Sequence, residues 1–233
     1  MNAAARMLRL AALCCGVSAA AGAAETPTSL TLHFDFFYNG LRAAEVTEVF
    51  SADENGGYEI TSHAAALGLA KIFYGDVVRK SVGRIDRTDG LRPLRYEEKR
   101  GKRPQTVAEI DEKTGEISLR KGDETRAETA PDAPLTDYLS ALYRPYILKK
   151  MTPGRTASTD GWRLKVYEYM AGDPEEVQTA AGVFSAIPLF RESPRGRRVL
   201  WFAPSLGYIP VKTHIDDKGH IFEAILTKIG GDS

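Results

Sequence analysis

The sequence predicts a mainly β protein in which one curved antiparallel sheet, an unclosed barrel, wraps around one main α-helix. Two observations support the sheet: short segments alternate between apolar and polar residues, and turn-forming residues separate most of them. A third supports the helix, because a single segment near residue 140 repeats its apolar residues every three to four positions. Helices and strands do not alternate along the chain, which excludes a doubly wound α/β fold.

The first strands form the clearest β-hairpin of the sequence. Residues 30–38 alternate leucine and aromatic side chains with mostly polar ones, the period of a half-buried strand. Asn39 and Gly40 follow, and both tolerate the positive φ angles that a two-residue hairpin turn requires. Residues 41–51 then return as the partner strand. The pattern predicts an antiparallel pair with its turn at Gly40.

The rest of the chain continues as a meander of short strands. Turns are predicted at residues 53–57, 86–90, 101–104, 111–115 and 216–219. Strands are predicted at residues 58–66, 77–85, 91–100, 106–110, 116–121, 162–169, 199–202, 208–215 and 220–229. Strands joined by such short turns must be antiparallel, because a parallel pair needs a long crossover.

One segment, residues 135–144, is predicted to form an amphipathic helix of about three turns. Its apolar face consists of Leu135, Tyr138, Leu139 and Leu142. Either Asp132 or Thr136 is expected to cap its start. Pro145 is expected to end or kink it, because proline lacks the N–H that a helix needs. The apolar face must then pack on the sheet.

A curved sheet around one helix often leaves an apolar groove between them, and such grooves hold small apolar ligands. Tyr138 and Leu142 on the helix and Trp201 on a late strand are the candidate lining residues. Further aromatic residues are available for this role, although a β core of this size uses the same residue types. The architecture therefore predicts a binding site for an amphiphile or a lipid-like molecule.

The N-terminus carries the pattern of a secretory signal peptide. Arg6 and Arg9 form a basic head, a stretch of small and apolar residues runs to Ala20, and the sequence Ala-Gly-Ala follows as a typical cleavage site. The apolar run is too short for a membrane-spanning helix, which needs about 20 residues. We therefore expect a signal peptide at residues 1–23, a single exported β-rich domain at residues 24–233, and a location in the periplasm.

The composition excludes several classes of function. The 31 basic and 31 acidic residues balance, so the protein has no overall field to attract nucleic acid. Both cysteines, Cys14 and Cys15, lie in the expected signal peptide, which excludes disulfides, thiol catalysis and cysteine-bound metals from the mature chain. No later segment is long and apolar enough to span a bilayer. We expect no nucleic-acid partner, no cofactor and no transmembrane segment in the mature chain.

The sequence contains none of the motifs that mark common catalytic sites. Nucleophile elbows, zinc-protease helices, phosphate-binding loops and dinucleotide-binding loops are all absent. His214 and His220 flank a turn that contains Asp216, but two histidines and one aspartate are too few for a typical zinc site. The aspartate-glycine turns do not match the ligand spacing of an EF-hand loop. The prediction is a protein without catalytic or metal-binding residues.

Asp137 and Ser140 form the most suggestive polar pair, three residues apart on the predicted helix, with Arg144 four residues further on. Two interpretations are open. A hydrolase would use Ser140 as its nucleophile, but the neighbouring sequence offers no histidine base. A structural pair would hydrogen-bond locally and fix the start of the helix, as Asp and Ser side chains commonly do. We favour the structural interpretation.

Four short motifs occur in an order that points to a known family. They are the Asn39-Gly40 turn, Asp-Gly-Leu-Arg-Pro ending at Pro93, Thr-Asp-Tyr-Leu-Ser ending at Ser140, and Trp201 followed by Gly-Tyr-Ile-Pro-Val around Pro210. Together they resemble the exported bacterial family called domain of unknown function 3108, over about residues 30–229. The motif residues with expected structural roles are Gly40, Pro93, Asp137, Ser140 and Pro210.

The resemblance implies a periplasmic protein with the open half-barrel shape of bacterial lipoprotein carriers, in which a curved antiparallel sheet surrounds a helix. The family has no defined biochemical role and brings no catalytic residues. A carrier function inferred from it would be an analogy between folds. The resemblance therefore implies a shape and a location.

Three hypotheses for the function follow. The first is a non-catalytic envelope protein that binds an amphiphile in the groove between sheet and helix. The second is an envelope interaction or scaffolding protein that uses a sheet edge or its two basic segments, residues 99–103 and 191–198. Partner binding would then depend on arginines of the second segment, namely Arg195, Arg197 and Arg198. The third is an undescribed hydrolase built around the helix serine.

Overall fold

The computed structural model describes residues 29–230, and the expected signal peptide at residues 1–23 lies outside this range. The strands are β1 (Ser29–Tyr38), β2 (Leu41–Ala52), β3 (Gly57–Ala66), β4 (Val77–Asp86), β5 (Gly90–Arg100), β6 (Thr106–Ile110), β7 (Glu116–Lys121), β8 (Glu124–Thr129), β9 (Leu135–Asp137), β10 (Gly154–Thr159), β11 (Leu164–Ala171), β12 (Glu175–Thr179), β13 (Gly182–Ser193), β14 (Gly196–Ala203), β15 (Ile209–Asp217) and β16 (His220–Gly230). The helices are α1 (Gly68–Phe73) and α2 (Ser140–Leu148), with a 3-10 turn at Pro204–Leu206. Neither α-helix of this range has the length and apolar character needed to cross a membrane.

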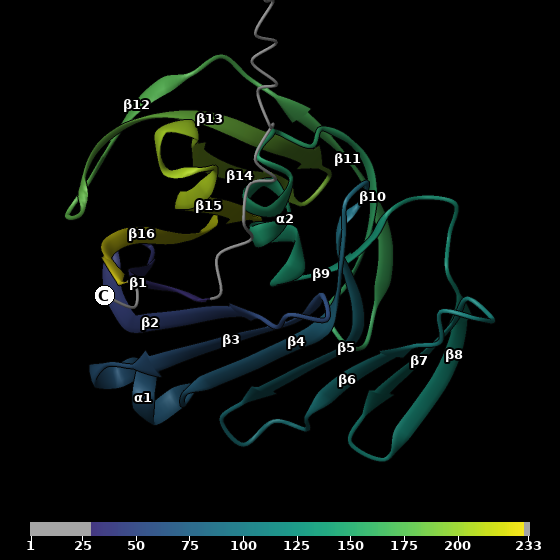
Figure 1. Cartoon of the computed structure of the whole chain (residues 1–233). Coiled ribbons are helices and arrows are strands. Elements are labelled where there is room, and N and C mark those ends of the chain that lie inside the picture. Colours follow the sequence, from purple (N-terminus) through teal and green to yellow (C-terminus); the bar gives the residue numbers. More distant parts are fainter. Residues whose placement is uncertain (1–28, 231–233) are drawn as a thin grey trace, which may run out of the picture.

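All strands belong to one sheet, in the order β8-β7-β6-β5-β4-β3-β2-β1-β16-β15-β14-β13-β11-β10-β9, with β12 also paired to β13. Neighbouring strands are antiparallel except for β9 and β10, which run parallel because α2 connects them. The two ends of the path, β8 and β9, do not pair, so the sheet is unclosed. Figure 1 shows the sheet curving around α2. The predicted mainly β class, the antiparallel pairing and the single main helix are confirmed.

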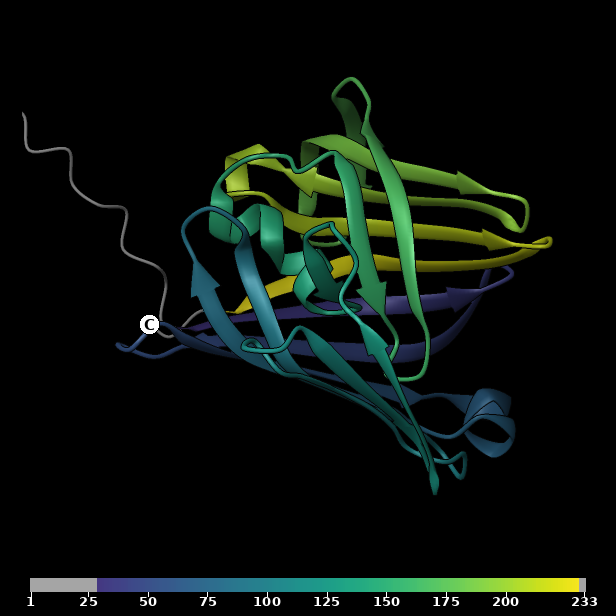
Figure 2. The same cartoon turned by 90° about the vertical axis from the view of Figure 1, so that its right-hand side faces the viewer.

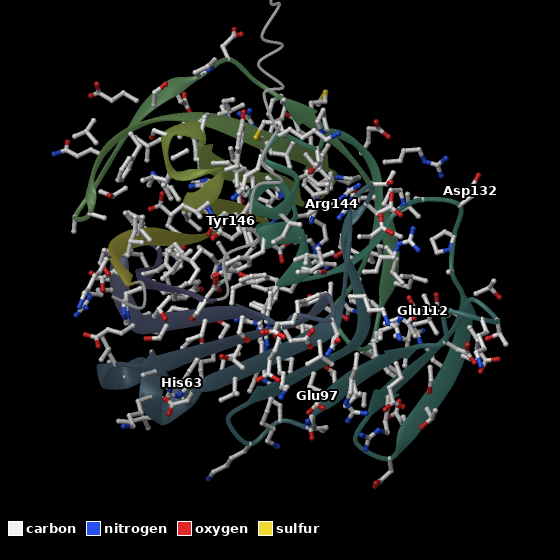
Figure 3. The ribbon with its side chains drawn as sticks, viewed as in Figure 1. His63, Glu97, Glu112, Asp132, Arg144 and Tyr146 are labelled. Atoms are coloured by element: carbon white, nitrogen blue, oxygen red, sulfur yellow. The ribbon has the colours of Figure 1, made fainter. Side chains whose placement is uncertain are left out.

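The core lies on the concave side of the sheet, where α2 packs. Phe34 of β1 is buried there, as is its partner Leu226 of β16. From α2, Tyr143 stacks on Phe50 of β2 with ring centroids 5.8 Å apart, and Tyr146 meets the same ring edge-on at 6.0 Å. Figure 3 shows Tyr146 within the curve of the sheet. Because such aromatic pairs add about 0.5–1.5 kcal/mol to the effect of burial, these rings fix the helix to the sheet.

The main helix begins later than predicted. Residues 135–137 form β9, and the hydroxyl of Thr136 donates to a carbonyl of β10 instead of capping a helix. The carboxylate of Asp137 accepts hydrogen bonds from the backbone N–H groups of Leu139 and Ser140, so the first helical turn starts after it. The predicted start at residue 135 is wrong because pairing with β10 extends the backbone there.

The helix also continues beyond Pro145, so this proline does not end it, which was one of the two expected outcomes. At this position a proline leaves only the carbonyl of Ala141 without its helical donor. Pro145 and Tyr146 are buried, and this burial offsets the lost hydrogen bond. The helix ends where Lys149 adopts left-handed backbone angles. Asp132, the other expected cap, lies before β9 and is not at the helix start.

The sequence pattern does not predict five of the strands, namely β8, β9, β10, β12 and β13. In β8 half of the residues are charged and five of the six are exposed, and β12 has one buried residue. Strand β13 carries Pro188 in its interior. These segments become strands because their neighbours offer unpaired backbone groups. A tertiary contact therefore decides their conformation.

Both motif prolines lie at β-bulges. Pro93 of β5 pairs with Gly83 of β4 at the point where the register between these strands shifts. Pro210 of β15 pairs with Phe202 of β14 at a similar shift. Proline donates no hydrogen bond to a strand ladder, so bulges are the positions where a sheet tolerates it. Gly40 lies in the β1–β2 turn with a φ of 77°.

Candidate ligand-binding cavity

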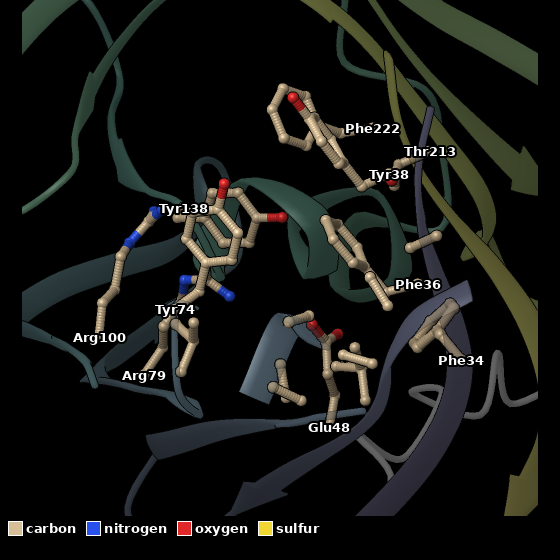
Figure 4. Close-up of a pocket in the computed structure, with 18 of the residues that line it drawn as sticks. Phe34, Phe36, Tyr38, Glu48, Tyr74, Arg79, Arg100, Tyr138, Thr213 and Phe222 are labelled. Carbon is tan, nitrogen blue, oxygen red and sulfur yellow. The ribbon is translucent and has the colours of Figure 1, made fainter. Parts of the chain in front are cut away.

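A cavity of about 410 Å³ lies between the curved sheet and α2. Its large apolar lining residues include Phe34, Phe36, Val46, Leu142 and Phe222. Strands β2 and β3 contribute Ala44, Ala64 and Ala66, and these small side chains leave the space that the aromatic residues face. Figure 4 shows the aromatic residues of β1 and β16 along one wall. The volume lies within the roughly 300–1,000 Å³ that small-molecule sites occupy.

The cavity opens at the end of the barrel that carries α1, which Figure 2 shows beside the turns of several hairpins. Ala70 and Tyr74 line one side of the mouth, and Arg103, from the turn after β5, also lines it. Tyr38 and His220 belong to another part of the rim, where the tyrosine hydroxyl and the histidine Nδ1 are 2.8 Å apart. Their rings stack with centroids 6.0 Å apart. The mouth therefore combines aromatic and basic groups.

Glu48 of β2 is the one carboxylate among the lining residues, and it is 5% exposed. It accepts hydrogen bonds from the hydroxyls of Tyr143, at 3.0 Å, and Ser62, at 3.3 Å. Burial raises the pKa of Glu48, while these hydrogen bonds and the charge of Arg79 oppose the rise. The carboxyl group is thus held in place at the cavity wall by donors from β3 and α2.

Arg79 of β4 and Arg100 of β5 line the wall away from the phenylalanines (Figure 4). Both donate to Glu98 Oε2, Arg79 Nε at 2.6 Å and Arg100 Nη2 at 2.9 Å. Burial favours the protonated form of Glu98, but hydrogen bonds from Arg100 and the charge of Arg79 hold its pKa below the ordinary value. Two cations therefore share this one carboxylate.

A second pair of arginines lies on the concave side of β13 and β14. Arg191 and Arg198 stand directly opposite one another in the strand register. Arg198 is on the same face of β14 as Leu200, whose partner Thr213 lines the cavity. The guanidinium of Arg198 lies 5.2 Å from the ring centroid of Tyr138, which also lines the cavity. These two cations therefore adjoin the cavity wall.

Like charges directly opposite on neighbouring strands destabilise a sheet unless something compensates them. Within residues 29–230, Arg191 and Arg198 form no ion pair with a carboxylate, and the Nε atom of each is buried without a hydrogen-bond partner. Arg191 lies 3.8 Å from the ring centroid of Tyr167. Cation–π contacts with the rings of Tyr167 and Tyr138 therefore compensate the two positive charges. The basic segment 191–198 was identifiable from the sequence, but the inward orientation of these two arginines was not.

The structure brings two of the three candidate lining residues to the cavity. Tyr138 and Leu142 line it, whereas Trp201 does not. Trp201 lies on the other face of β14, where its indole N–H donates to Glu175 and its ring lies 5.4 Å from the ammonium of Lys212. The expectation for Trp201 is therefore wrong. Residues 199–202 are apolar on both faces, so alternation could not show which face turns inward.

Asp137 and Ser140 hydrogen-bond to one another in the interior of the protein. The Ser140 hydroxyl accepts a hydrogen bond from the Asp137 backbone N–H at 2.8 Å, and the Ser81 hydroxyl donates to Asp137 Oδ2 at 2.6 Å. Both residues have no exposed surface. Burial raises the pKa of Asp137 to about 6, although these donors oppose the rise. Arg144, which follows Ser140 by four residues, donates to the backbone carbonyl of Asp89 (Figure 3 labels Arg144).

The histidines have partners elsewhere. His33 lies within hydrogen-bond distance of Thr47, His63 is 3.7 Å from Asp76, and His214 is 3.2 Å from Glu223. His214 and His220 do not pair across their hairpin, because the register places Glu223 opposite the first and Asp217 opposite the second. Within residues 29–230, no three His, Cys, Asp or Glu side chains are grouped so that they could hold a metal ion.

Comparison of the sequence with models of known protein families finds a match. Residues 33–226 match the model of DUF3108, described as a protein of unknown function. The chain belongs to the DUF3108 family. The resemblance expected from the ordered motifs is thereby confirmed. No curated protein matches this DUF3108 chain in sequence.

Three solved structures are similar to this DUF3108 protein to different degrees. A β-barrel-like protein of the domain of unknown function DUF1849 from Brucella abortus is similar, with a TM-score of 0.57 and 9% identity over 89% of this chain and 100% of that one. A candidate lipoprotein from Parabacteroides distasonis has a TM-score of 0.35 and 12% identity, over 88% of this chain and 97% of its own. A candidate exported protein with a YmcC-like fold from Bacteroides fragilis has a TM-score of 0.32 and 16% identity, over 88% of this chain and 96% of its own. Only the Brucella protein, whose TM-score is 0.57, supports the fold, and at these identities none of the three assigns a function.

Proposed function

We propose that this protein is a non-catalytic protein of the cell envelope that binds an amphiphile or lipid-like molecule between the sheet and α2. The observation that carries this proposal is the cavity itself. Its wall of phenylalanines faces small alanines, so the protein's own side chains leave it open. Apolar concave sites with a few polar groups are typical of small-molecule binding.

The charges around the cavity favour an acidic head group on this ligand. Arg79 and Arg100 share one carboxylate, and Arg198 contacts the ring of Tyr138 without an acidic partner in the described chain. Arginine donors suit carboxylate and phosphate groups, which they bind through paired hydrogen bonds. A ligand with an apolar tail among the phenylalanines would place its acidic end near these groups.

Two features support the location in the envelope and the non-catalytic role. The basic head, apolar stretch and Ala-Gly-Ala site at the N-terminus favour export to the envelope. The burial of Ser140, with its hydroxyl bonded to the backbone of Asp137, favours a non-catalytic role, because a substrate could not reach that hydroxyl.

The direct test is to fill the cavity and measure binding of a dansyl-labelled fatty acid by fluorescence. Ala64 and Ala65 are neighbours on β3, equally half-buried, and only Ala64 lines the cavity. We expect Ala64→Trp to weaken binding by about tenfold or more, because the indole occupies the ligand's space. Ala65→Trp, on the opposite face, should bind as the wild type does. Equal binding by both variants, or no binding by the wild type, would refute the proposal.

The head-group preference needs a separate competition experiment. Dodecanoate, dodecanol and dodecyltrimethylammonium have the same tail length but acidic, neutral and cationic heads. We expect dodecanoate to displace the fluorescent probe best, and Arg198→Gln to reduce this preference. If the three compounds compete equally, the cavity binds by its apolar wall alone, and the proposal of an acidic head group is wrong.

A further inference from the structure

Helix α1 exposes an unusual amount of apolar surface. Leu69 is 71% exposed, Ile72 is 76% and Phe73 is 74%, and the helix contributes no buried residue. Tyr74, directly after the helix, is 61% exposed. Single exposed apolar residues are common, but a contiguous group of large ones marks a contact site. The packing of the barrel does not require these side chains, so they are available to another surface.

The barrel holds α1 firmly at its rim. The side chain of Asp76, just after the helix, accepts a hydrogen bond from the Ala66 backbone N–H at 2.9 Å. The carbonyl of Asp76 accepts another from Gly101 at 2.8 Å, and the backbone N–H of Leu67 donates to Ala43 at 2.8 Å. These bonds tie α1 to β2, β3 and the turn after β5. The exposed side chains therefore project from a fixed support, and Figure 2 shows α1 at the outer end of the sheet.

Basic residues surround this apolar group. They are Lys71 on α1 and Lys99, Arg100, Lys102 and Arg103 at the end of β5 and in the following turn, all exposed. Within residues 29–230, Arg100 is the one member of this set that pairs with a carboxylate, Glu98. The chain as a whole has balanced charges, so this excess is local. We call α1 and residues 99–103 together the rim patch.

We propose that the rim patch docks on the surface of an anionic lipid bilayer and brings the cavity mouth to it. Apolar side chains above a set of lysines and arginines are the combination by which peripheral proteins bind such membranes. The patch is a convex projection, which suits insertion between lipid head groups. Ala70 of α1 and Tyr74, directly after the helix, also line the cavity, so the docked surface and the mouth are continuous. Passage of a ligand between bilayer and cavity rests on the proposed function, whereas docking does not.

The test measures flotation of the purified protein, lacking residues 1–23, with two kinds of vesicle. One contains phosphatidylcholine only, and the other contains phosphatidylcholine and phosphatidylglycerol. We expect binding to the anionic vesicles that falls with added salt, and a loss of about tenfold or more in Ile72→Ser/Phe73→Ser, since both side chains lose apolar burial. The control Val166→Ser/Met170→Ser removes two exposed apolar residues from β11 and should bind like the wild type.

A fluorescent label would show whether the tip enters the lipid. The only cysteines, Cys14 and Cys15, lie in the expected signal peptide, so Phe73→Cys gives a single labelling site in the mature chain. An environment-sensitive dye there should brighten and shift to the blue on anionic vesicles, while the same dye at Val166→Cys should not change. Retained binding by the double α1 variant, or a dye at residue 73 that does not respond, would overturn the docking proposal.

Failure of docking can be told apart from failure of ligand binding. Ile72→Ser/Phe73→Ser should bind the dansyl-labelled fatty acid in vesicle-free solution as well as the wild type does. Ala64→Trp should still float with anionic vesicles. Loss of both properties in either variant would contradict the separation of the rim patch from the cavity.

Discussion

Helices α1 and α2 lie on the same curved sheet, and their surroundings differ sharply. Helix α2 lies inside the curve, where five of its nine residues are buried, and Asp137 bonds to its first turn. Helix α1 projects from the rim with three large apolar side chains exposed, a fourth on the residue after it, and no buried residue. Because stability depends on burial and satisfied polar groups, only α2 contributes much to the fold. The composition of α1 requires another explanation, which contact with a lipid surface supplies.

The comparison predicts that the largest loss of stability follows from removing the Asp137 side chain. Asp137→Ala leaves the Leu139 and Ser140 N–H groups and the Ser81 hydroxyl without their buried acceptor. We expect a loss of about 3–5 kcal/mol in the free energy of unfolding, measured by urea denaturation. Asp137→Asn keeps an acceptor and serves as the control, with a smaller loss. An alanine variant as stable as the wild type would show that α2 does not depend on this group.

The second prediction concerns pH. The pKa of Asp137 is about 6 in the folded protein, above its ordinary 3.8, chiefly because of burial. Between these values the folded state binds the proton more tightly than the unfolded state, so the contribution of Asp137 to stability is greatest below pH 3.8 and is lost as pH rises through 6. The effect amounts to about 3 kcal/mol.

This pH effect is measured as a difference between the wild type and Asp137→Asn. Other carboxylates, such as Glu98, have a lowered pKa and act in the opposite direction, but they are common to both proteins and cancel. The stability of the wild type relative to the variant should increase from pH 7.5 to pH 4.5. A flat difference would mean that Asp137 titrates normally.

A smaller effect is expected at the contact between α2 and the cavity wall. Tyr143→Phe removes the hydroxyl that donates to Glu48 and leaves that buried carboxylate with the Ser62 hydroxyl. We expect a loss of about 1–2 kcal/mol in the free energy of unfolding at pH 7. The loss should shrink at low pH, where Glu48 is protonated. A loss that does not depend on pH would point to packing of the ring rather than to the hydrogen bond.

The smallest effect is expected on α1. Ile72→Ser and Phe73→Ser change side chains that are about three-quarters exposed, so each should alter the free energy of unfolding by less than about 0.5 kcal/mol. Urea denaturation of both single variants checks this. A loss of more than 1 kcal/mol, a threshold of about twice the usual surface effect, would show that α1 stabilises the barrel after all.

The amino-acid sequence by itself determined the β class, most strands of the meander and the turn at Gly40, because these features depend on local alternation and turn chemistry. It also indicated that Tyr138 and Leu142 lie near a cavity, since the apolar stripe of the one long helical segment had to face the sheet. The ordered motifs were sufficient to indicate the family.

Tertiary structure decided the features that depend on which partner a segment meets. Pairing with β10 made residues 135–137 a strand and delayed the helix, which a local pattern cannot foresee. The curvature of the sheet turned Arg191 and Arg198 inward and Trp201 outward, and a bulge beside Trp201 alters the register there. Alternation shows that two faces differ, but only the curvature of the assembled sheet determines which face becomes the inside.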